Sequence, residues 1–344
     1  MSRIRTQSAC LLLSVTFGAS LAGAGGSAPI YSFSFGTFGS GNGQFNQPFD
    51  VTFGPGNLLY VVDAVNHRIQ RFTTDGAFVS KWGSFGSDPG EFYLPGQIAF
   101  DSQGNAYVAD RLNHRIQKFT ADGGFLLQWG TLGSGPGQMN QPWGITVDAL
   151  DAVYVTEFVN DRVQKFTTQG AFVTQWGSTG SGDGQFFHPR GIDSAPDGSI
   201  YVSETLNNRV QRFTPSGSFL MKWGTTGSPK GSGDPSPPGT FTHAVGLDVD
   251  EQGYVYVADW DLHPHAGRVQ KFTANGAFIW QFRGDYGSGP AQYMEIMDVA
   301  VHSSGYFYTA DKLNHRIQVW ETIGVPASEG LETKSWARIK SSYR

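Results

Sequence analysis

The chain repeats one short pattern six times, and this constrains its fold more than any other feature. In its clearest copy, at residues 107–119, the pattern reads Tyr-Val-Ala-Asp-Arg-Leu-Asn-His-Arg-Ile-Gln-Lys-Phe. The other copies lie at residues 60–72, 154–166, 201–213, 256–272 and 308–320, so that their first tyrosines are 47, 47, 47, 55 and 52 residues apart. Self-similarity at a period of roughly 50 residues indicates a propeller or a solenoid.

Each repeat unit contains four short apolar segments separated by turn residues. In the second unit we expect strands at residues 97–100, 106–109, 115–119 and 125–129. Asp101-Ser102-Gln103-Gly104 and Ala121-Asp122-Gly123 separate them, and glycine accepts the positive φ that tight hairpin turns require. The sequence therefore predicts an all-β protein, a six-bladed β-propeller of four-stranded antiparallel blades.

The two ends of the repeat region complement each other. The sixth unit lacks the Phe-x-x-x-Trp-Gly segment that the first four units carry at residues 78–83, 125–130, 172–177 and 219–224. A similar segment, Tyr-Ser-Phe-Ser-Phe-Gly, lies at residues 31–36. We expect this first strand to complete the last blade, which closes the ring and removes an exposed sheet edge.

The N-terminus has the pattern of a secretory signal. Arg3 and Arg5 precede a mostly apolar run at 10–21, and Ala22-Gly23-Ala24 fits a small-x-small cleavage site. The run is too short for a membrane span; a disordered or anchoring N-terminus is the alternative. We expect residues 1–24 to be a signal peptide, 29–325 the propeller and 326–344 a tail that is either a docking element or a frayed end, in a secreted, periplasmic or cell-surface protein.

With these units in register, the chain resembles the NHL repeat family over residues 31–325. The Asn-His pair that gives this family part of its name stands at Asn66-His67, Asn113-His114 and Asn314-His315. The resemblance implies a propeller that serves as a binding platform or a sensor domain or, less often, as a lyase or lactonase.

Residues that recur in every unit are expected to support the fold. Asp110 and Arg115 flank one turn, and a carboxylate and a guanidinium recur at these positions in the other units. Such a pair satisfies the polar groups of a turn. The place of His114 is taken by Asp161 and Asn208 in other units, which indicates a polar turn position and not a metal ligand.

Function is expected where the repeat is kept but the side chains differ. The loops that lead into the innermost strands and those that join the second and third strands emerge on one face. Aromatic rings and cations on it are typical of recognition surfaces, although some of these side chains could instead pack against neighbouring loops. The candidate ligand-binding residues are Phe49, Gln97, Arg111, Trp143, Phe158, Arg190, Trp260 and Lys312.

The fifth unit carries two insertions, and both are expected on this same face. One is a Pro/Gly/Ser-rich stretch within residues 224–246, and the other lies in residues 259–268. Loops extended on one side of a repeat array usually carry its specificity. Asp261, His263 and His265 in the second insertion form a weak alternative metal site for zinc.

Among enzymes, the chain resembles the peptidyl-α-hydroxyglycine amidating lyases, which hold a channel zinc through histidines. One of these histidines lies in a Met-Pro-His-Asp stretch, which here reads Glu295-Ile296-Met297-Asp298. Methionine in place of histidine argues against lyase chemistry. The aspartate, which in that family helps to hold a structural calcium, is kept as Asp298, and Asp50 takes the equivalent place in the adjacent blade. Two carboxylates near a narrow channel favour a hard cation, so Asp50 and Asp298 are the candidate calcium ligands.

We therefore expect a secreted, monomeric, non-catalytic binding or scaffolding module for a protein, peptide or glycan. The alternative is a metal-dependent lyase or lactonase with its site in the central channel. The formal net charge is −5, which argues against sequence-independent binding to nucleic acid, since that requires clustered cations.

Overall fold

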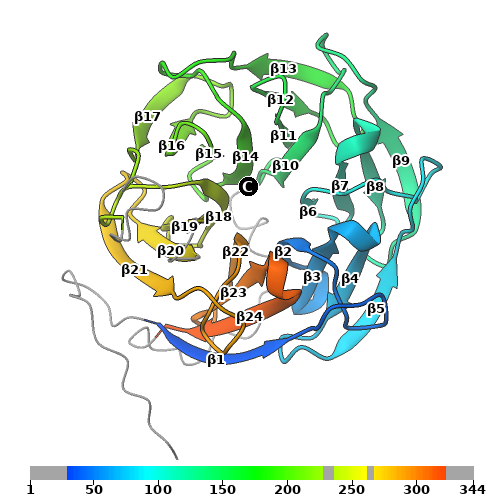
Figure 1. Ribbon diagram of the computed structural model, residues 1–344. Helices are drawn as coiled ribbons and strands as arrows, with labels where there is room; N and C mark the ends of the chain where they lie inside the picture. The colour runs from blue at the N-terminus through cyan, green and yellow to red at the C-terminus, as the bar shows by residue number, and fades with distance from the viewer. Residues whose placement is uncertain (1–28, 228–235, 262–266, 323–344) are drawn as a thin grey trace, which may run out of the picture.

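The protein is a six-bladed β-propeller. The computed structural model describes residues 29–227, 236–261 and 267–322. Within them, six four-stranded antiparallel sheets surround one axis (Figure 1). The predicted fold class is confirmed. No helix among the described residues is both long enough and apolar enough to cross a membrane.

The strands follow one another outward from the axis in every blade. The first three blades consist of β2 (Pro48–Gly54), β3 (Leu58–Asp63), β4 (Arg68–Phe72) and β5 (Phe78–Trp82); β6 (Ile98–Phe100), β7 (Ala106–Asp110), β8 (Arg115–Phe119) and β9 (Phe125–Trp129); and β10 (Pro142–Val147), β11 (Val153–Glu157), β12 (Arg162–Phe166) and β13 (Phe172–Trp176). The last three consist of β14 (Pro189–Ser194), β15 (Ile200–Glu204), β16 (Arg209–Phe213) and β17 (Phe219–Trp223); β18 (Ala244–Val249), β19 (Val255–Asp259), β20 (Gly267–Phe272) and β21 (Phe278–Gly284); and β22 (Ile296–Val301), β23 (Tyr306–Asp311), β24 (Arg316–Glu321) and β1 (Ile30–Phe35).

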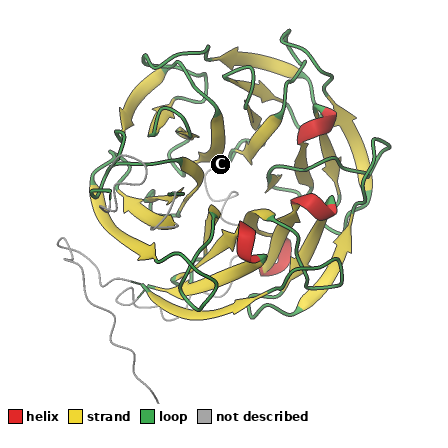
Figure 2. Ribbon diagram, in the orientation of Figure 1, coloured by secondary structure: helices red, strands yellow, loops and turns green. Residues whose placement is uncertain are grey.

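Single turns of 3₁₀ helix, red in Figure 2, mark three of the loops between second and third strands. These are η2 (Ala64–Asn66), η3 (Arg111–Asn113) and η4 (Lys312–Asn314), while η1 (Pro55–Asn57) joins β2 to β3. Arg111 and Lys312, two of the candidate ligand-binding residues, thus begin such turns. The turn determines where these two cations lie on the face that carries the loops between second and third strands.

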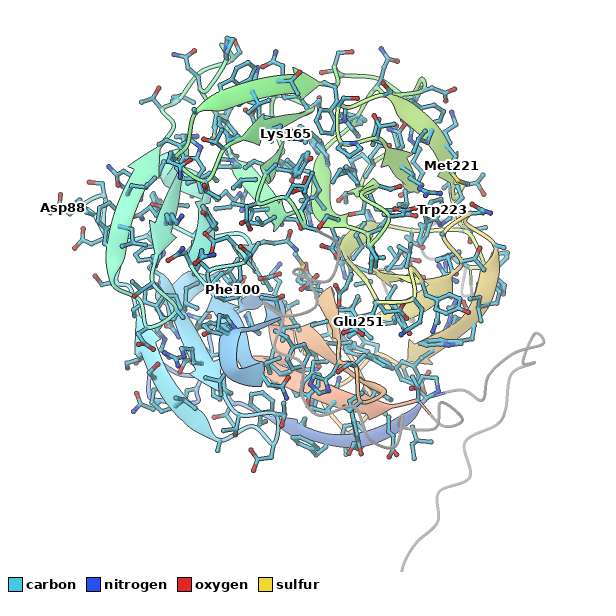
Figure 3. All side chains as sticks on the ribbon, turned by 180° about the vertical axis from the view of Figure 1, so that it is seen from behind. Asp88, Phe100, Lys165, Met221, Trp223 and Glu251 are labelled. Atoms are coloured by element: carbon cyan, nitrogen blue, oxygen red, sulfur yellow. The ribbon has the colours of Figure 1, made fainter. Side chains whose placement is uncertain are left out.

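The blades bury both faces of their middle strands. All five residues of β7 are buried, whereas half-buried and exposed positions alternate along the outermost strand β5. This is expected where each sheet is covered on both sides by its neighbours. Phe100 shows the packing between blades, because its ring centroid lies 4.5 Å from that of Tyr60 in blade 1. Figure 3 shows Phe100 in the interior of the ring and Asp88 at its edge.

The N-terminal strand closes the ring, as predicted. β1 pairs with β24, with Tyr31 opposite Trp320. Phe35 of β1 then packs against Phe72 of blade 1, with 5.1 Å between ring centroids. Strand pairing within the last blade and aromatic packing against the first blade therefore join the two ends of the repeat region.

The recurring carboxylate and arginine form a buried ion pair in all six blades. In blade 2, Arg115 Nε lies 2.7 Å from Asp110 Oδ2, and its Nη atoms donate to the carbonyls of Ser87 (2.7 Å) and Glu91 (2.9 Å). The corresponding pairs are Arg68–Asp63, Arg162–Glu157, Arg209–Glu204, Arg268–Asp259 and Arg316–Asp311. Each arginine thus binds the linker that precedes its blade. The structural role expected for these residues is confirmed.

The histidines of the repeat join neighbouring blades. His67 has a left-handed backbone conformation, with φ of 54°, and its Nδ1 accepts the backbone N–H of Leu94 in the next blade at 3.1 Å. His315 does the same for the N–H of Gln47 at 3.0 Å, across the closure of the ring. This polar turn position therefore ties one blade to the next.

Candidate functional site

An irregularity near the start of the innermost strands separates two sets of side chains. The pairing register shifts between Pro48 and Asp50 in blade 1, and shifts at the matching place occur in blades 3 to 6. A β-bulge of this kind bends the strand and re-aims a side chain. Residues at the bulge form one end of the axial region, and residues further along the strand line the central channel.

At the bulge, aromatic rings from blades that are not neighbours meet over the axis. Phe49 of blade 1 stacks on Trp143 of blade 3, with centroids 5.6 Å apart and planes inclined by 11°. Both are nearly buried, with 8% and 6% of their surfaces exposed. Blade 2 carries Gly96 between them, where a Cβ would lie 2.4 Å from the carbonyl oxygen of Trp143. Glycine at this place therefore makes room for the close approach.

Three cations lie on these rings. The guanidinium carbons of Arg111 and Arg190 are 4.1 and 4.5 Å from the centroid of Trp143, within the range of cation–π attraction. Arg111 and Arg190 also contact the ring of Phe158, at 5.8 and 5.3 Å. Lys312 Nζ lies 5.6 Å from the centroid of Phe49. We call the group Phe49, Arg111, Trp143, Phe158, Arg190 and Lys312 the cationic cap.

The cations of the cap differ in how well they are paired. Lys312 forms an ion pair with Glu295 at 2.8 Å, and Arg111 donates from Nε and Nη2 to Gln141 Oε1 at 3.2 and 2.8 Å. Arg190 makes no side-chain hydrogen bond or ion pair with any residue that the structure describes, and its Nε is buried without an acceptor. A buried polar group in this state is costly.

Burial also acts on the charges of the two arginines. It lowers the pKa of each guanidinium to about 10, and for Arg111 the charge of Arg190 contributes to this lowering. Glu295 acts on Arg190 in the opposite direction. At neutral pH both guanidinium groups are still protonated, so two like charges lie within 4.5 Å of the centroid of one indole ring.

Six of the eight predicted ligand-binding residues come together in the cationic cap, and the other two lie elsewhere. Gln97 is buried and lines the channel beside Asp50, to which it is hydrogen-bonded. Trp260 packs on His243 within blade 5, with 4.7 Å between ring centroids. Phe49 and Trp143 are buried, which leaves Phe158, Arg111, Arg190 and Lys312 as the partly exposed groups of the cap.

Beneath the cap, the innermost strands line a channel with a cavity of about 60 Å³. Asp50 and Asp298, from adjacent blades, share a hydrogen bond there. Asp50 Oδ2 also accepts the N–H of Ile98 at 3.0 Å, and Asp298 Oδ2 that of Val51 at 3.1 Å. Burial raises the pKa of Asp50 to about 6 and that of Asp298 well above its usual range.

A second carboxyl pair lines the same channel, and the sequence reasoning missed it. Asp193 and Asp248, from blades 4 and 5, are hydrogen-bonded to each other. Asp193 Oδ2 accepts the N–H of Val249 at 2.9 Å, and Asp248 Oδ2 that of Val301 at 2.6 Å. Burial raises the pKa of both. Asp193 and Asp248 lie two residues further along their innermost strands than the position that Asp50 occupies in blade 1. Side chains two residues apart point to the same side of a strand, so their position in the channel could have been predicted.

The channel offers oxygen atoms to a cation, but few of them. Asp298 Oδ1 and Gln97 Oε1 are buried and accept no hydrogen bond from an N–H group or a hydroxyl in the described structure, and such oxygens suit calcium. No group of three or more His, Cys, Asp or Glu side chains within the described ranges has the arrangement of a metal site. Of the weak zinc alternative, His263 and His265 lie outside the described residues, and Asp261 interacts electrostatically with Arg283.

The fold and the repeats define a class of protein. The sequence model of the NHL repeat matches residues 45–72, 92–119 and 139–166, which begin at buried linker positions and end with the third strand of blades 1 to 3. The chain is an NHL-repeat protein. None of the curated proteins compared with it matches its sequence.

Solved structures share the fold at low sequence identity. A protein of unknown function from Bacteroides thetaiotaomicron is 19% identical with a TM-score of 0.64, and the match covers 86% of this chain and 76% of that one. A virginiamycin B lyase from Staphylococcus aureus is 15% identical with a TM-score of 0.56, covering 84% and 95%. A gluconolactonase from Xanthomonas campestris is 15% identical with a TM-score of 0.57, covering 82% and 87%. At this identity the likeness concerns the fold alone.

Proposed function

We propose that this chain is a secreted binding module whose ligand, a protein, peptide or glycan, contacts the cationic cap. The observation that carries the proposal is Arg190, a cation held on Trp143 with no acceptor for its hydrogen-bond donors among the described residues. Arginines that support the fold are paired in every blade, as Arg209 is with Glu204. A guanidinium held without such partners is better suited to contact a ligand.

The chemistry of the axial region favours binding over catalysis. The channel is lined by aliphatic, threonine, glutamine and aspartate side chains, with no histidine among its lining residues. The cap contributes guanidinium and ammonium groups, which remain protonated at neutral pH and cannot serve as general bases there. Such a site holds a ligand through charge and shape.

The direct test is a peptide and glycan array probed with the purified propeller, with Arg190→Met as the comparison. The proposal predicts ligands that the wild type binds and the variant does not. Arg212→Met is a matched control, because Arg212 lies over Tyr201 in the same blade but is paired with Asp197 in a turn at the other end of the blade. Turnover of a lactone without binding on either array would refute the proposal.

The four channel aspartates support a second candidate, a metal-dependent lyase or lactonase. Asp50 and Asp298, together with the free oxygen of Gln97, would hold a calcium ion. A bound calcium would polarise a carbonyl oxygen of the substrate. Meanwhile the backbone N–H groups of Ile98 and Val51 would keep the two carboxylates in place.

Thermal unfolding in millimolar calcium and in chelator tests this second candidate without an assay of activity. Calcium bound at Asp50 and Asp298 should raise the melting temperature of the wild type, because a ligand that binds only the folded state stabilises it. Asp298→Asn should abolish the effect. Equal melting temperatures in calcium and chelator for the wild type would argue against the metal site.

A further inference from the structure

We propose that Arg111 and Arg190 form a binding site for a carboxylate group, presented by an acidic peptide. The inference rests on the proposed binding function and specifies the ligand of the same site. It starts from the juxtaposition of two guanidinium groups on one indole ring, with no carboxylate bound to either among the described residues.

The charges of the cap are out of balance. It holds three cations, and the carboxylate whose charge acts on Arg190 is that of Glu295, which is already bonded to Lys312 at 2.8 Å. Arg111 donates two hydrogen bonds to Gln141 Oε1, which carries no charge. The guanidinium groups of Arg111 and Arg190 therefore form no ion pair with a carboxylate among the described residues. A bound anion would reduce the repulsion between Arg111 and Arg190 and supply acceptors for their free donors.

Geometry favours a carboxylate as that anion. A guanidinium group is planar and presents its N–H donors as a fork that matches the two oxygens of a carboxylate. The Trp143 ring holds both guanidinium carbons within 4.5 Å of its centroid, which limits their movement. A preorganised pair loses less side-chain entropy on binding than two free arginines would.

The surroundings of Arg111 favour a peptide as the carrier of the carboxylate. Arg111 begins η3, and this turn is bonded to the preceding linker through Asn113 Nδ2 to the Gly86 carbonyl at 2.8 Å. The backbone N–H of Leu112 in the same turn donates to the Tyr93 carbonyl at 3.0 Å.

Two aromatic residues on this linker are exposed, Phe85 by 64% and Tyr93 by 40%, and their rings pack edge to face at 5.2 Å. Together they form an apolar patch on the linker that is bonded to the η3 turn. A peptide with an apolar side chain beside an acidic one would contact both the patch and the arginine pair.

The test is calorimetric titration with a panel of capped hexapeptides, each with one Glu next to one Leu or Phe. A matched panel carries Gln in place of Glu, and a uronate-containing oligosaccharide is a third probe. We expect Glu peptides to bind at least tenfold more tightly than their Gln counterparts, with the preference lost in about 1 M salt, where exposed charges are screened.

Three variants locate the binding. Arg190→Met should weaken binding of the Glu peptides at least tenfold and leave any Gln peptide unaffected, while Arg212→Met should change neither. Phe85→Ser should weaken both panels equally, because it removes only the apolar contact. Circular dichroism melts of all variants establish that each is folded before it is titrated.

The outcomes separate this inference from the function on which it rests. Equal binding of Glu and Gln peptides, or binding of the uronate alone, would overturn the acidic-peptide inference and leave the binding module standing. If the propeller binds no peptide and no glycan, both proposals fail. Loss of the Glu preference in Arg212→Met as well as Arg190→Met would place the carboxylate elsewhere and overturn the assignment to this pair.

Discussion

Arg190 of blade 4 lies on the indole ring of Trp143 of blade 3, with its guanidinium carbon 4.5 Å from the ring centroid. In the same blade, Arg209 is bonded to Glu204 and to three linker carbonyls. The two arginines therefore have opposite environments, since one completes the scaffold and the other is held against an aromatic ring without an acceptor. This contrast separates residues that build the propeller from those that we propose to bind its ligand.

Replacing one of the arginines that form the buried ion pairs is expected to lower the free energy of unfolding strongly. Replacing Arg115 with methionine would leave Asp110 buried without its countercharge, and breaking a buried pair in this way typically costs about 3–5 kcal/mol. The control is Lys222→Met, whose ion pair with Asp183 is largely exposed and which should cost at most about 1 kcal/mol. Urea unfolding measures both. Similar losses for the two variants would contradict the structural role of the buried pair.

Closure of the ring by β1 should be needed for a stable monomer. Deleting residues 30–35 would expose the edge of β24, which pairs with β1 along its length, and unpaired edges promote association. We expect a lower melting temperature and a shift to aggregates in size-exclusion chromatography. Phe35→Ser, which removes the packing on Phe72 but keeps the strand, should be intermediate. A deletion variant that melts like the wild type and stays monomeric would disprove this account of closure.

The channel aspartates should make stability fall as pH rises through the acid range. Burial raises the pKa of Asp50 to about 6, against about 3.9 for an aspartate in an unfolded chain. Between these values the folded state holds more protons than the unfolded state, so the free energy of unfolding contributed by this group decreases with increasing pH. Asp298→Asn supplies a neutral partner that still donates to Asp50.

We expect Asp298→Asn to flatten this pH dependence and to be more stable than the wild type near pH 7. Urea unfolding in chelator at several pH values between about 4 and 8 measures the effect, with Asp183→Asn, a substitution at an exposed site, as the control. A variant with the slope of the wild type, or one that is less stable near pH 7, would contradict the assignment.

Much of the fold could be predicted from the sequence because the repeat fixes strand order, turn positions and closure by simple periodicity. The face that carries Arg111 and Arg190 could be predicted for the same reason, since strand direction alone brings those loops together. The stacking of Phe49 on Trp143 could not, because it depends on how closely the blades approach the axis past Gly96. The distance between blades at the axis is determined by tertiary packing, which produces no local pattern in the sequence.

The channel was predicted only in part, and the reason is again physical. Asp50 and Asp298 stand at the bulge, where a resemblance to known enzymes drew attention to them. Asp193 and Asp248 lie two residues further along the strand, where the other blades carry threonine or alanine. Strand alternation places these side chains on the same side as Asp50, but their hydrogen bond to each other depends on how the two blades pack.

The most direct test of the central claim is the free energy of unfolding of Arg190→Met, measured without ligand. If Arg190 is held for a ligand, its removal abolishes an unpaired buried donor and the repulsion on Arg111, while methionine keeps the packing on Trp143. The account then predicts a variant at least as stable as the wild type, as is common when a functional residue is replaced. A variant destabilised by about 2 kcal/mol or more, as for an arginine that supports the fold, would contradict it.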